Sequence, residues 1–455
     1  MKAWEGKHVI IMGLARQGLA LIRCLARYGA HIVVTDLKSR KQLSEELAEI
    51  EDLIEGLYLG VHPASMLDGT DAIFLSGGVP ADLPFIQEAR KREIRVLNDS
   101  QLFLEQVSVP VIGITGSAGK STTTSLTGHI LRQFVREKGY RVHVGGNIGN
   151  PLIASLEEIK PGDQVVMELS SFQLEIMARS PQTAALLNIS PNHLDRHKTM
   201  ENYLAAKAQI FAFQELEDWA LIGCDDELVR TVKQEITSRL LGFGRSIGDL
   251  DGVSFDDKAF FQHWQGKIST ICEVGETPLR GEHNLWNAAA AFALCSTREV
   301  PVEVMRSALH SFHGLSHRLE EVARIHGVLW VNDSIATTPE RASAALRSFT
   351  EPLVILAGGR DKGLPWTPFA AAANIQTKEV ILFGEAAEII GNALHEAGCR
   401  CKVHIVENLE EAVLTAASSA KPDSVVLLSP GCTSFDAFKD FEERGERFKE
   451  LVAGL

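Results

Sequence analysis

Residues 112–121 read IGITGSAGKS, a pattern typical of the strand, loop and helix of an α/β domain. An apolar, strand-like run ends at Thr115, a glycine-bearing turn follows, and Gly119 and Lys120 open a helical pattern. Glycines let the backbone curl so that several N–H groups point at one anion, and a helix N-terminus adds partial positive charge. Lys120 would reach the β- and γ-phosphates of a nucleotide, while the Ser121 hydroxyl would hold Mg²⁺. The stretch therefore predicts a nucleotide-phosphate site between a strand and a helix of an α/β domain.

The spacing of this loop differs from the strict phosphate-loop pattern GxxxxGK[ST]. Position 114 is Ile, and the glycines stand at 113, 116 and 119. The alternative is an ordinary strand–helix turn. That alternative leaves unexplained why a lysine follows a glycine-lined loop.

Short apolar runs alternate with helical patterns on both sides of the loop. On its N-terminal side, the runs at 8–13 (HVIIMG), 31–36 (HIVVTD) and 72–77 (AIFLSG) are rich in β-branched residues and end in polar or glycine-containing turns. Residues 17–28 have helical spacing between the first two runs. This alternation predicts a parallel sheet that is covered by helices on both faces.

Two further series of strands and helices follow. A second series runs from VPVIGITGS to WALIGCDD, and a third begins with VLWVNDS and ends with SVVLLSPG. Residues 242–279 have less helical pattern and predict a small antiparallel addition. We therefore expect three consecutive α/β domains: a Rossmann-like domain at 1–107, a phosphate-loop ATPase domain with the antiparallel addition at 108–312, and a Rossmann-like domain at 313–455.

The composition is that of a globular protein. The 455 residues are 45% hydrophobic and 23% charged, with a formal net charge of -14. An acidic chain lacks the attraction to phosphate backbones that nucleic-acid binding needs, and no apolar run reaches the ~18 residues of a membrane span. The cysteines are scattered without zinc spacing, and the N-terminus has no signal-peptide layout. We expect a cytoplasmic monomer with reduced thiols that binds neither nucleic acid nor membrane.

Candidate metal ligands follow two strands of the second series. VVMELSSFQLE places Glu168 at a strand end, and NISPNHLDRH places His193 and Asp195 just beyond another. A metal near a phosphate loop takes oxygen donors and sometimes an imidazole. Taken singly, Glu168 also fits a helix cap and His193 a core histidine, but their place beside a phosphate loop favours the metal. Lys207, in YLAAKAQIF, has the pattern of a solvated lysine on a helix surface.

The N-terminal loop is a weaker candidate for a phosphate site. Residues 13–20, GLARQGLA, join a strand to a helix, and Asp36 ends the second strand. The loop is similar to a dinucleotide fingerprint but lacks GxGxxG. Two interpretations stay open: a diphosphate site for a nucleotide-linked substrate, or a close-packed turn with no ligand.

The motifs together resemble the Mur ligase family over essentially the whole chain. They are, in order, GITGSAGKST, GGNIG, ELSSFQLE, HNLWNAAAA, HRLE, NDSIAT, GGRDKG and LSPGCTSFDAFKDFEERGERF. HRLE, NDSIAT and the SFDAFKDF tail are similar to the branch that adds glutamate, and the DNPR-like motif of the branch adding a diamino acid is missing. The resemblance implies an ATP-dependent ligase that joins D-glutamate to UDP-N-acetylmuramoyl-L-alanine through an acyl phosphate, in cytoplasmic synthesis of peptidoglycan precursors.

The resemblance also implies roles for individual residues. The nucleotide would be bound by Gly116, Gly119, Lys120, Ser121 and Thr122 at its phosphates, by Asn284 and Asn287 near adenine, and by Arg318 and Asp333 near the phosphates and ribose. Two Mg²⁺ ions would be held by Ser121, Glu168, His193 and a carbamylated Lys207. The catalytic residues would be Lys120, His193 and Lys207. The uridine diphosphate end of the substrate would be bound by Arg16, Asp36, Ser76, Gly77 and Asn147. The incoming glutamate would be surrounded by Thr337, Lys362, Ser434 and Phe441.

The sequence departs from the family pattern at Ala118, Asn192 and Ile335. The family usually has Asn, Asp and Lys at these places, so Ile335 removes a cation; we hypothesise that Arg341 or Lys362 supplies part of that charge. Three alternatives stay open. They are a changed amino-acid preference, such as L-glutamate, a same-fold ligase of the folylpolyglutamate synthase kind, and a nucleotide-binding homologue without ligase activity.

Overall fold

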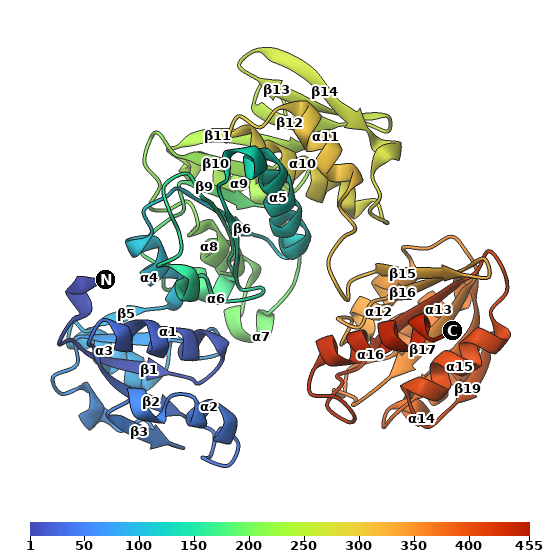
Figure 1. Ribbon diagram of the computed structural model, residues 1–455, viewed down its shortest axis with the longest axis horizontal. Coiled ribbons are helices and arrows are strands. Elements are labelled where there is room, and N and C mark those ends of the chain that lie inside the picture. The colour runs from blue at the N-terminus through green and yellow to red at the C-terminus, as the bar shows by residue number, and fades with distance from the viewer. The chain divides into compact units, whose positions relative to one another are not determined.

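The computed structural model describes residues 1–455, with the exception of the side chain of Asp195. The described residues fall into two compact units (Figure 1). The first unit contains Met1–Thr277 and His283–Ser311, and the second contains Pro278–Glu282 and Phe312–Leu455. The domain boundaries near residues 107 and 312 stay predictions.

The first sheet is parallel and has the strand order β3-β2-β1-β4-β5. Its strands are β1 (His8–Met12), β2 (His31–Asp36), β3 (Gly56–Leu59), β4 (Ala72–Leu75) and β5 (Arg95–Leu97), and the helices around it are α1 (Arg16–Arg27), α2 (Ser44–Ala48), α3 (Pro84–Lys91) and α4 (Asp99–Gln106). Because β1 lies between β2 and β4, the loops after β1 and β4 part at this point of the sheet and leave a crevice there.

The second sheet has the order β14-β13-β12-β11-β10-β9-β6-β8-β7. Its strands are β6 (Val111–Thr115), β7 (Val142–Gly146), β8 (Gln164–Glu168), β9 (Thr183–Leu186), β10 (Trp219–Gly223), β11 (Arg239–Gly244), β12 (Asp251–Phe255), β13 (Ala259–Trp264) and β14 (Lys267–Glu273). The strands from β6 to β12 run parallel, whereas β12, β13 and β14 pair antiparallel. This confirms the small antiparallel addition predicted within 242–279.

Helices accompany the second sheet, and α10 packs on α5. They are α5 (Lys120–Val135), α6 (Ser171–Leu174), α7 (Leu194–His197), α8 (Met200–Ala208), α9 (Glu227–Thr231), α10 (His283–Ser296) and α11 (Val302–His310). Helix α10 is buried along nearly its whole length, because its alanine run from Ala288 to Ala291 lets it lie close to α5 and the sheet. The phosphate loop joins β6 to α5, so it begins at the carboxyl end of β6, which lies between β9 and β8 in the parallel part of the sheet (Figure 1).

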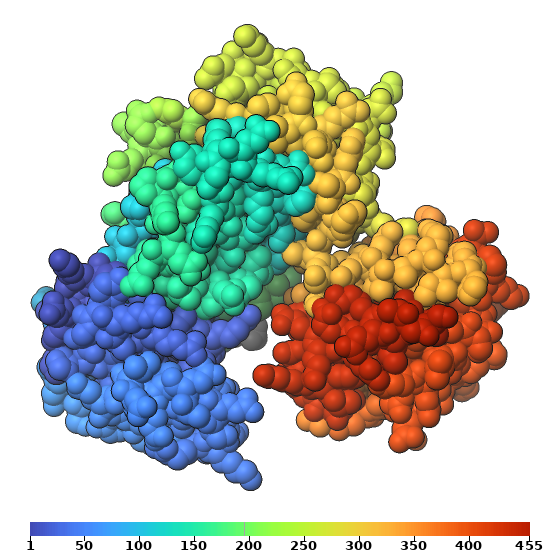
Figure 2. Space-filling model, viewed as in Figure 1, coloured from blue at the N-terminus to red at the C-terminus, as the bar shows by residue number. Residues whose placement is uncertain are grey.

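The third sheet forms the second unit and has the order β15-β16-β20-β17-β18-β19. Its strands are β15 (Glu320–Ile325), β16 (Val328–Asn332), β17 (Leu353–Gly358), β18 (Thr377–Phe383), β19 (Lys402–Ile405) and β20 (Val425–Gly431). The accompanying helices are α12 (Pro339–Leu346), α13 (Thr367–Gln376), α14 (Ala387–Glu396), α15 (Leu409–Ser419) and α16 (Phe441–Ala453). All pairs are parallel except β15 with β16. The atoms of this unit, orange and red in Figure 2, form one continuous body.

The structure confirms the predicted α/β fold class. The apolar runs form the interior strands, which are buried on both faces, as in β17 and β20. The cysteines are free thiols, as expected. None of the helices in the described part of the chain has the length and apolar character needed to cross a membrane.

Candidate functional site

The phosphate loop owes its shape to glycine at position 119. Gly119 is the N-cap of α5 and has φ +80°, in the left-handed region. A Cβ at this position would lie 2.1 Å from Oδ1 of Asn287, so only glycine fits between the loop and α10. The Nζ of Lys120 donates to the carbonyl oxygens of Gly116 at 2.8 Å and Ser117 at 3.0 Å. The lysine therefore lies over the loop, where an anion would meet it.

A residue that was not singled out in the sequence closes the other side of the loop. Oδ1 of Asn188 accepts the backbone N–H of Ala118 at 2.8 Å, and its Nδ2 donates to the Ala118 carbonyl at 3.0 Å. Asn188 follows β9, which is the neighbour of β6. Its position just beyond a predicted strand was the available signal, because the ends of neighbouring parallel strands meet at one edge.

Lys207 is buried, which overturns its interpretation as a solvated surface lysine. It is 1% exposed, and its Nζ donates to the Gly116 carbonyl at 2.9 Å. Lys120 donates to the same carbonyl, so the two amines converge on one oxygen atom. Burial, together with the neighbouring charge of Lys120, lowers the pKa of the Lys207 ammonium to about 6. A large fraction of this side chain is therefore a neutral amine at pH 7.

Glu168 is a buried carboxylate and, within the described part of the chain, only one of its two oxygens accepts a hydrogen bond. It is 1% exposed, its Oε1 accepts from Nδ2 of Asn147 at 2.8 Å, and its Oε2 has no hydrogen-bond donor among the described residues. Ser170, not Glu168, caps α6, so the helix-cap interpretation is wrong. A buried carboxylate oxygen without a protein donor fits a bound cation.

The two nearby histidines differ in exposure. His193 is exposed and has φ +53° at the start of α7, so it is not a core histidine. Its ring meets the edge of Phe172 at 5.0 Å. The buried histidine is His197, which shares a 2.9 Å hydrogen bond with Oγ of Ser171. The side chain of Asp195 lies outside the described residues.

The residues predicted as metal ligands would suit a hard cation that also takes oxygen from substrate. Ser121 and Glu168 offer oxygen, and His193 offers one imidazole. Among the described side chains, no group of three or more His, Cys, Asp or Glu is placed to hold a metal without further donors. A divalent ion here would therefore draw ligands from phosphate, water or a modified lysine.

The N-terminal loop brings its predicted residues to the crevice beside β1. Asp36 accepts the backbone N–H groups of Leu14 and Lys38, each at 2.8 Å, so its carboxylate shapes the turn. Ser76 Oγ donates to the Gly13 carbonyl at 2.7 Å, and the N–H of Gly77 donates to Gln17 Oε1 at 3.1 Å. These contacts tie the loop after β4 to the loop after β1.

Arg16 and Asn147 line one cavity of about 150 Å³ together with Gly149. The Arg16 guanidinium donates to the Gly149 carbonyl at 3.2 Å. Asn147 contacts both this cavity and Glu168, and so links the N-terminal crevice to the surroundings of the phosphate loop.

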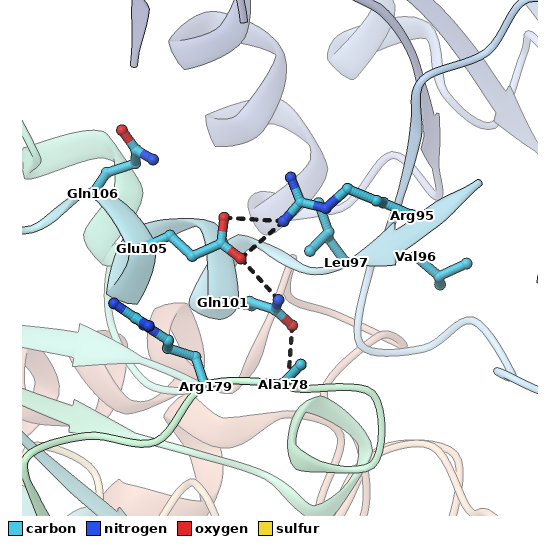
Figure 3. A pocket seen from close by; sticks show the side chains of 8 residues that line it. All are labelled: Arg95, Val96, Leu97, Gln101, Glu105, Gln106, Ala178 and Arg179. Carbon is cyan, nitrogen blue, oxygen red and sulfur yellow. Dashed lines mark hydrogen bonds and ion pairs between the residues drawn. The ribbon is translucent and has the colours of Figure 1, made fainter. Parts of the chain in front are cut away.

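A second, more open cavity of about 600 Å³ lies away from these residues (Figure 3). Its charged groups largely satisfy one another, since Arg95 donates to both oxygens of Glu105 at 3.0 and 3.2 Å. Gln101 donates to Glu105 and accepts the N–H of Ala178, as the dashed lines in Figure 3 show. This network fastens α4 to the loop around Ala178.

In the second unit, the predicted residues follow β16, β17 and β20. Asp333, just after β16, accepts from Ser429 Oγ at 2.9 Å and from the N–H of Leu319 at 3.2 Å. Burial raises the pKa of Asp333 to about 7. Thr337 lies further along the same loop, and the buried Ser434 follows β20. Phe441 begins α16 and its ring meets His317 edge-on at 6.1 Å.

Family models match most of the chain in three consecutive parts. They are the Mur ligase MurD-like N-terminal domain at residues 7–98, the Mur ligase middle domain at 114–295, and the glutamate ligase domain of Mur ligases at 317–432. A protein of Symbiobacterium thermophilum named UDP-N-acetylmuramoylalanine–D-glutamate ligase is 41% identical over 98% of this chain and 97% of its own. A relative of the same name from Clostridioides difficile is 37% identical over 99% of each chain. The chain belongs to the Mur ligase family.

Solved Mur ligase structures share this fold at low sequence identity. UDP-N-acetylmuramate-alanine ligase from Thermotoga maritima has a TM-score of 0.60 and 20% identity, covering 98% of this chain and 99% of its own. MurF ligase from Thermotoga maritima, solved in complex with ADP, has a TM-score of 0.55 and 19% identity, covering 100% and 97%. At this identity the likeness concerns the fold.

The predicted site residues of this Mur ligase are divided between the two units. In the first unit, Lys120, Lys207 and Glu168 gather at the carboxyl edge of the second sheet. Asn284 and Asn287 lie beside the phosphate loop on α10, where Asn287 Nδ2 donates to Asn284 Oδ1 at 2.8 Å. Arg318, Asp333 and the residues predicted for glutamate belong to the second unit. Their roles stay predictions.

Proposed function

We propose that this Mur ligase joins D-glutamate to UDP-N-acetylmuramoyl-L-alanine at the expense of ATP, in the synthesis of peptidoglycan precursors. The names of its relatives over the whole length of the chain support this substrate pair. The observation that carries the proposal is the convergence of Lys120 and Lys207 on the Gly116 carbonyl, beside a buried carboxylate, at the end of a phosphate loop. The monomeric state stays a prediction.

The chemistry requires two anions to meet. A carboxylate is a poor electrophile, so its oxygen first attacks the γ-phosphorus of ATP, ADP leaves, and an acyl phosphate forms. The neutral amine of glutamate then attacks the acyl carbon and loses a proton, and phosphate leaves with the electron pair of the broken C–O bond. Lys120 offsets the repulsion between ATP and the carboxylate. Mg²⁺ held by Ser121, Glu168 and His193 would neutralise charge on the phosphates.

Lys207 fits the proposed carbamate better than a simple cationic role. A neutral amine adds to CO₂ to give a carbamate and release one proton, whereas an ammonium cannot. The burial of Lys207 and its lowered pKa support the neutral form. The carbamate would turn this neutral amine beside Lys120 into an anion with two oxygens, which suits a second Mg²⁺.

Phosphate release from ATP tests the substrate assignment. The purified chain is incubated with UDP-N-acetylmuramoyl-L-alanine and either D-glutamate, L-glutamate, D-lysine or no amino acid. We expect release with D-glutamate only. Release with another amino acid would show that the enzyme prefers that amino acid to D-glutamate. No release with any of them, despite ATP binding, would indicate a non-catalytic homologue.

A changed amino-acid preference is the second candidate, and Ile335 is the reason for it. This apolar side chain lies in the loop between Asp333 and Thr337, where the family pattern has a cation.

Burial and the charge of Arg341 lower the pKa of Lys362, so these two cations act on one another near this loop. If Arg341 replaces the lost charge, Arg341→Ala should raise the KM for D-glutamate by about 2- to 10-fold. Arg347→Ala, at the other end of α12, is the control and should leave the KM for D-glutamate unchanged.

A further inference from the structure

A buried arginine joins the loops that carry the predicted glutamate site. Arg444, on α16, is 1% exposed. Its Nε donates to Ser334 Oγ at 3.0 Å, and its Nη2 donates to the carbonyl oxygens of Ser334 at 2.9 Å and Cys432 at 3.2 Å. One guanidinium thus binds the loop after β16 and the loop after β20 at the same time. Ser334 Oγ donates in turn to the Phe441 carbonyl at 2.8 Å, which ties the first loop to the start of α16.

The loop after β17 is fastened to the same place. The N–H of Arg360 donates to the Thr433 carbonyl at 2.9 Å, and the N–H of Thr433 donates back at 3.1 Å. A Cβ on Gly359 would lie 2.2 Å from the Thr433 oxygen and 3.1 Å from Nη1 of Arg444. The absence of a side chain at 359 therefore lets this loop close over the guanidinium.

The neighbour of Arg444 in sequence brings α16 close enough for these contacts. A Cβ on Gly445 would lie 2.1 Å from Nδ1 of His317, so α16 approaches this histidine only because residue 445 is glycine. The Gly445 carbonyl accepts from Nδ2 of Asn332, the last residue of β16, at 3.3 Å. The Arg444-Gly445 pair thereby fixes α16 against the carboxyl end of β16.

Stability alone does not account for a cation at this position. The described ion pairs do not include Arg444. Its hydrogen bonds go to neutral oxygens, and Nη1 has no partner among the described residues. Burial lowers its pKa to about 10. The charge of Asp436 favours the charged form, but no carboxylate pairs with the guanidinium directly among the described ion pairs. A buried charge without a directly bonded counter-ion costs free energy, whereas a five-donor planar group holds several carbonyls in a fixed geometry.

We propose that Arg444 is the positioning residue of the amino-acid site, because it sets the loops carrying Thr337 and Ser434 relative to each other and to Phe441 on α16. This inference rests on the proposed function, which assigns those loops to glutamate. The three strands concerned, β16, β20 and β17, are neighbours, and ligands of α/β sheets bind at the carboxyl ends of such strands.

Steady-state kinetics of Arg444→Lys tests the proposal. Lysine keeps the charge, but its single amino group cannot reproduce the planar set of N–H donors that bonds to Ser334 and Cys432. We expect the KM for D-glutamate to rise by at least about tenfold, with kcat reduced less and the KM for ATP within about twofold of wild type. Arg447→Met is the matched control, because Arg447 lies one turn further on α16 and pairs with Glu410 and Glu450 at the surface. It should leave all three constants unchanged.

A second variant covers the case that Arg444→Lys does not fold. Ser334→Ala removes the Oγ contact alone and should raise the KM for D-glutamate by about 2- to 5-fold. A KM within about 1.5-fold of wild type in Ser334→Ala and in every folded Arg444 variant, or equal rises in the KM values of ATP and D-glutamate, would overturn the positioning role. Wild-type turnover is measured first: its absence contradicts the proposed function and this inference with it, whereas normal wild-type turnover with unaltered variants contradicts this inference alone.

Discussion

Gly119→Ala should weaken ATP binding far more than an equivalent change elsewhere. Two effects combine at this position: a left-handed φ of +80° and a contact of 2.1 Å between the new methyl group and Asn287 Oδ1. The backbone strain costs about 1–2 kcal/mol and the overpacking about 1–3 kcal/mol. To relieve the contact, either the Gly119–Lys120 backbone or Asn287 must move, and both belong to the predicted nucleotide site. The overpacking alone corresponds to a loss of about 5- to 150-fold in ATP affinity.

Gly139→Ala separates the two effects. Gly139 has φ +72° in the same unit, and a Cβ there would meet nothing within 4 Å. This variant should therefore lose about the same stability from backbone strain and keep its ATP affinity within about twofold. Isothermal titration calorimetry with ATP and Mg²⁺ measures the ATP affinity of both variants. If folded Gly119→Ala binds ATP as tightly as Gly139→Ala, the loop is not the phosphate site.

Further changes test the predicted metal ligands and a buried carboxylate on α4. Glu168→Gln should raise the Mg²⁺ concentration for half-maximal activity by at least about tenfold, and an unchanged metal titration would exclude it as a ligand. Lys207→Ala should abolish turnover, and short-chain carboxylates should restore part of it by returning an oxygen ligand; failure of every carboxylate tried would count against the carbamate. Burial raises the pKa of Asp99 to about 7, so between about pH 4 and 7 the folded state keeps a proton that the unfolded state releases. Thermal stability should therefore fall as pH rises through this range, and equal slopes for wild type and Asp99→Asn would contradict this.

The sequence predicts the interior of the sheets better than their margins. Strands such as β6 and β17 are buried on both faces, so they appear as continuous apolar runs followed by glycine turns. The short strands β3, β5 and β15 were not predicted. They are partly exposed, as the burial of Arg95–Leu97 shows, and their pattern is set by neighbours that a local window does not contain.

The part of the site formed by a local backbone pattern could be predicted from the sequence. The residues whose environment is set by tertiary packing were harder to predict. Gly119 and Lys120 form a local pattern, which is visible in the sequence without any partner. Lys207 looks like a surface lysine, because nothing around it in the sequence shows that α8 packs against the end of β6. Arg444 stands in the charged run FEERGERF and likewise gives no local sign of burial. For Lys207 only the family resemblance pointed to a role. Arg444 lies within the tail motif that carries the resemblance, but the resemblance implied no role for it.

Transfer of an oxygen isotope from the substrate carboxylate to phosphate tests whether this amide ligase works through an acyl phosphate. UDP-N-acetylmuramoyl-L-alanine labelled with heavy oxygen in its carboxylate is turned over with ATP and D-glutamate, and the released phosphate is analysed by mass spectrometry. In the proposed route the carboxylate oxygen that attacks phosphorus stays bonded to it and departs in the released phosphate. We expect one labelled oxygen atom in each phosphate released. Unlabelled phosphate, released alongside normal amide formation, would contradict it.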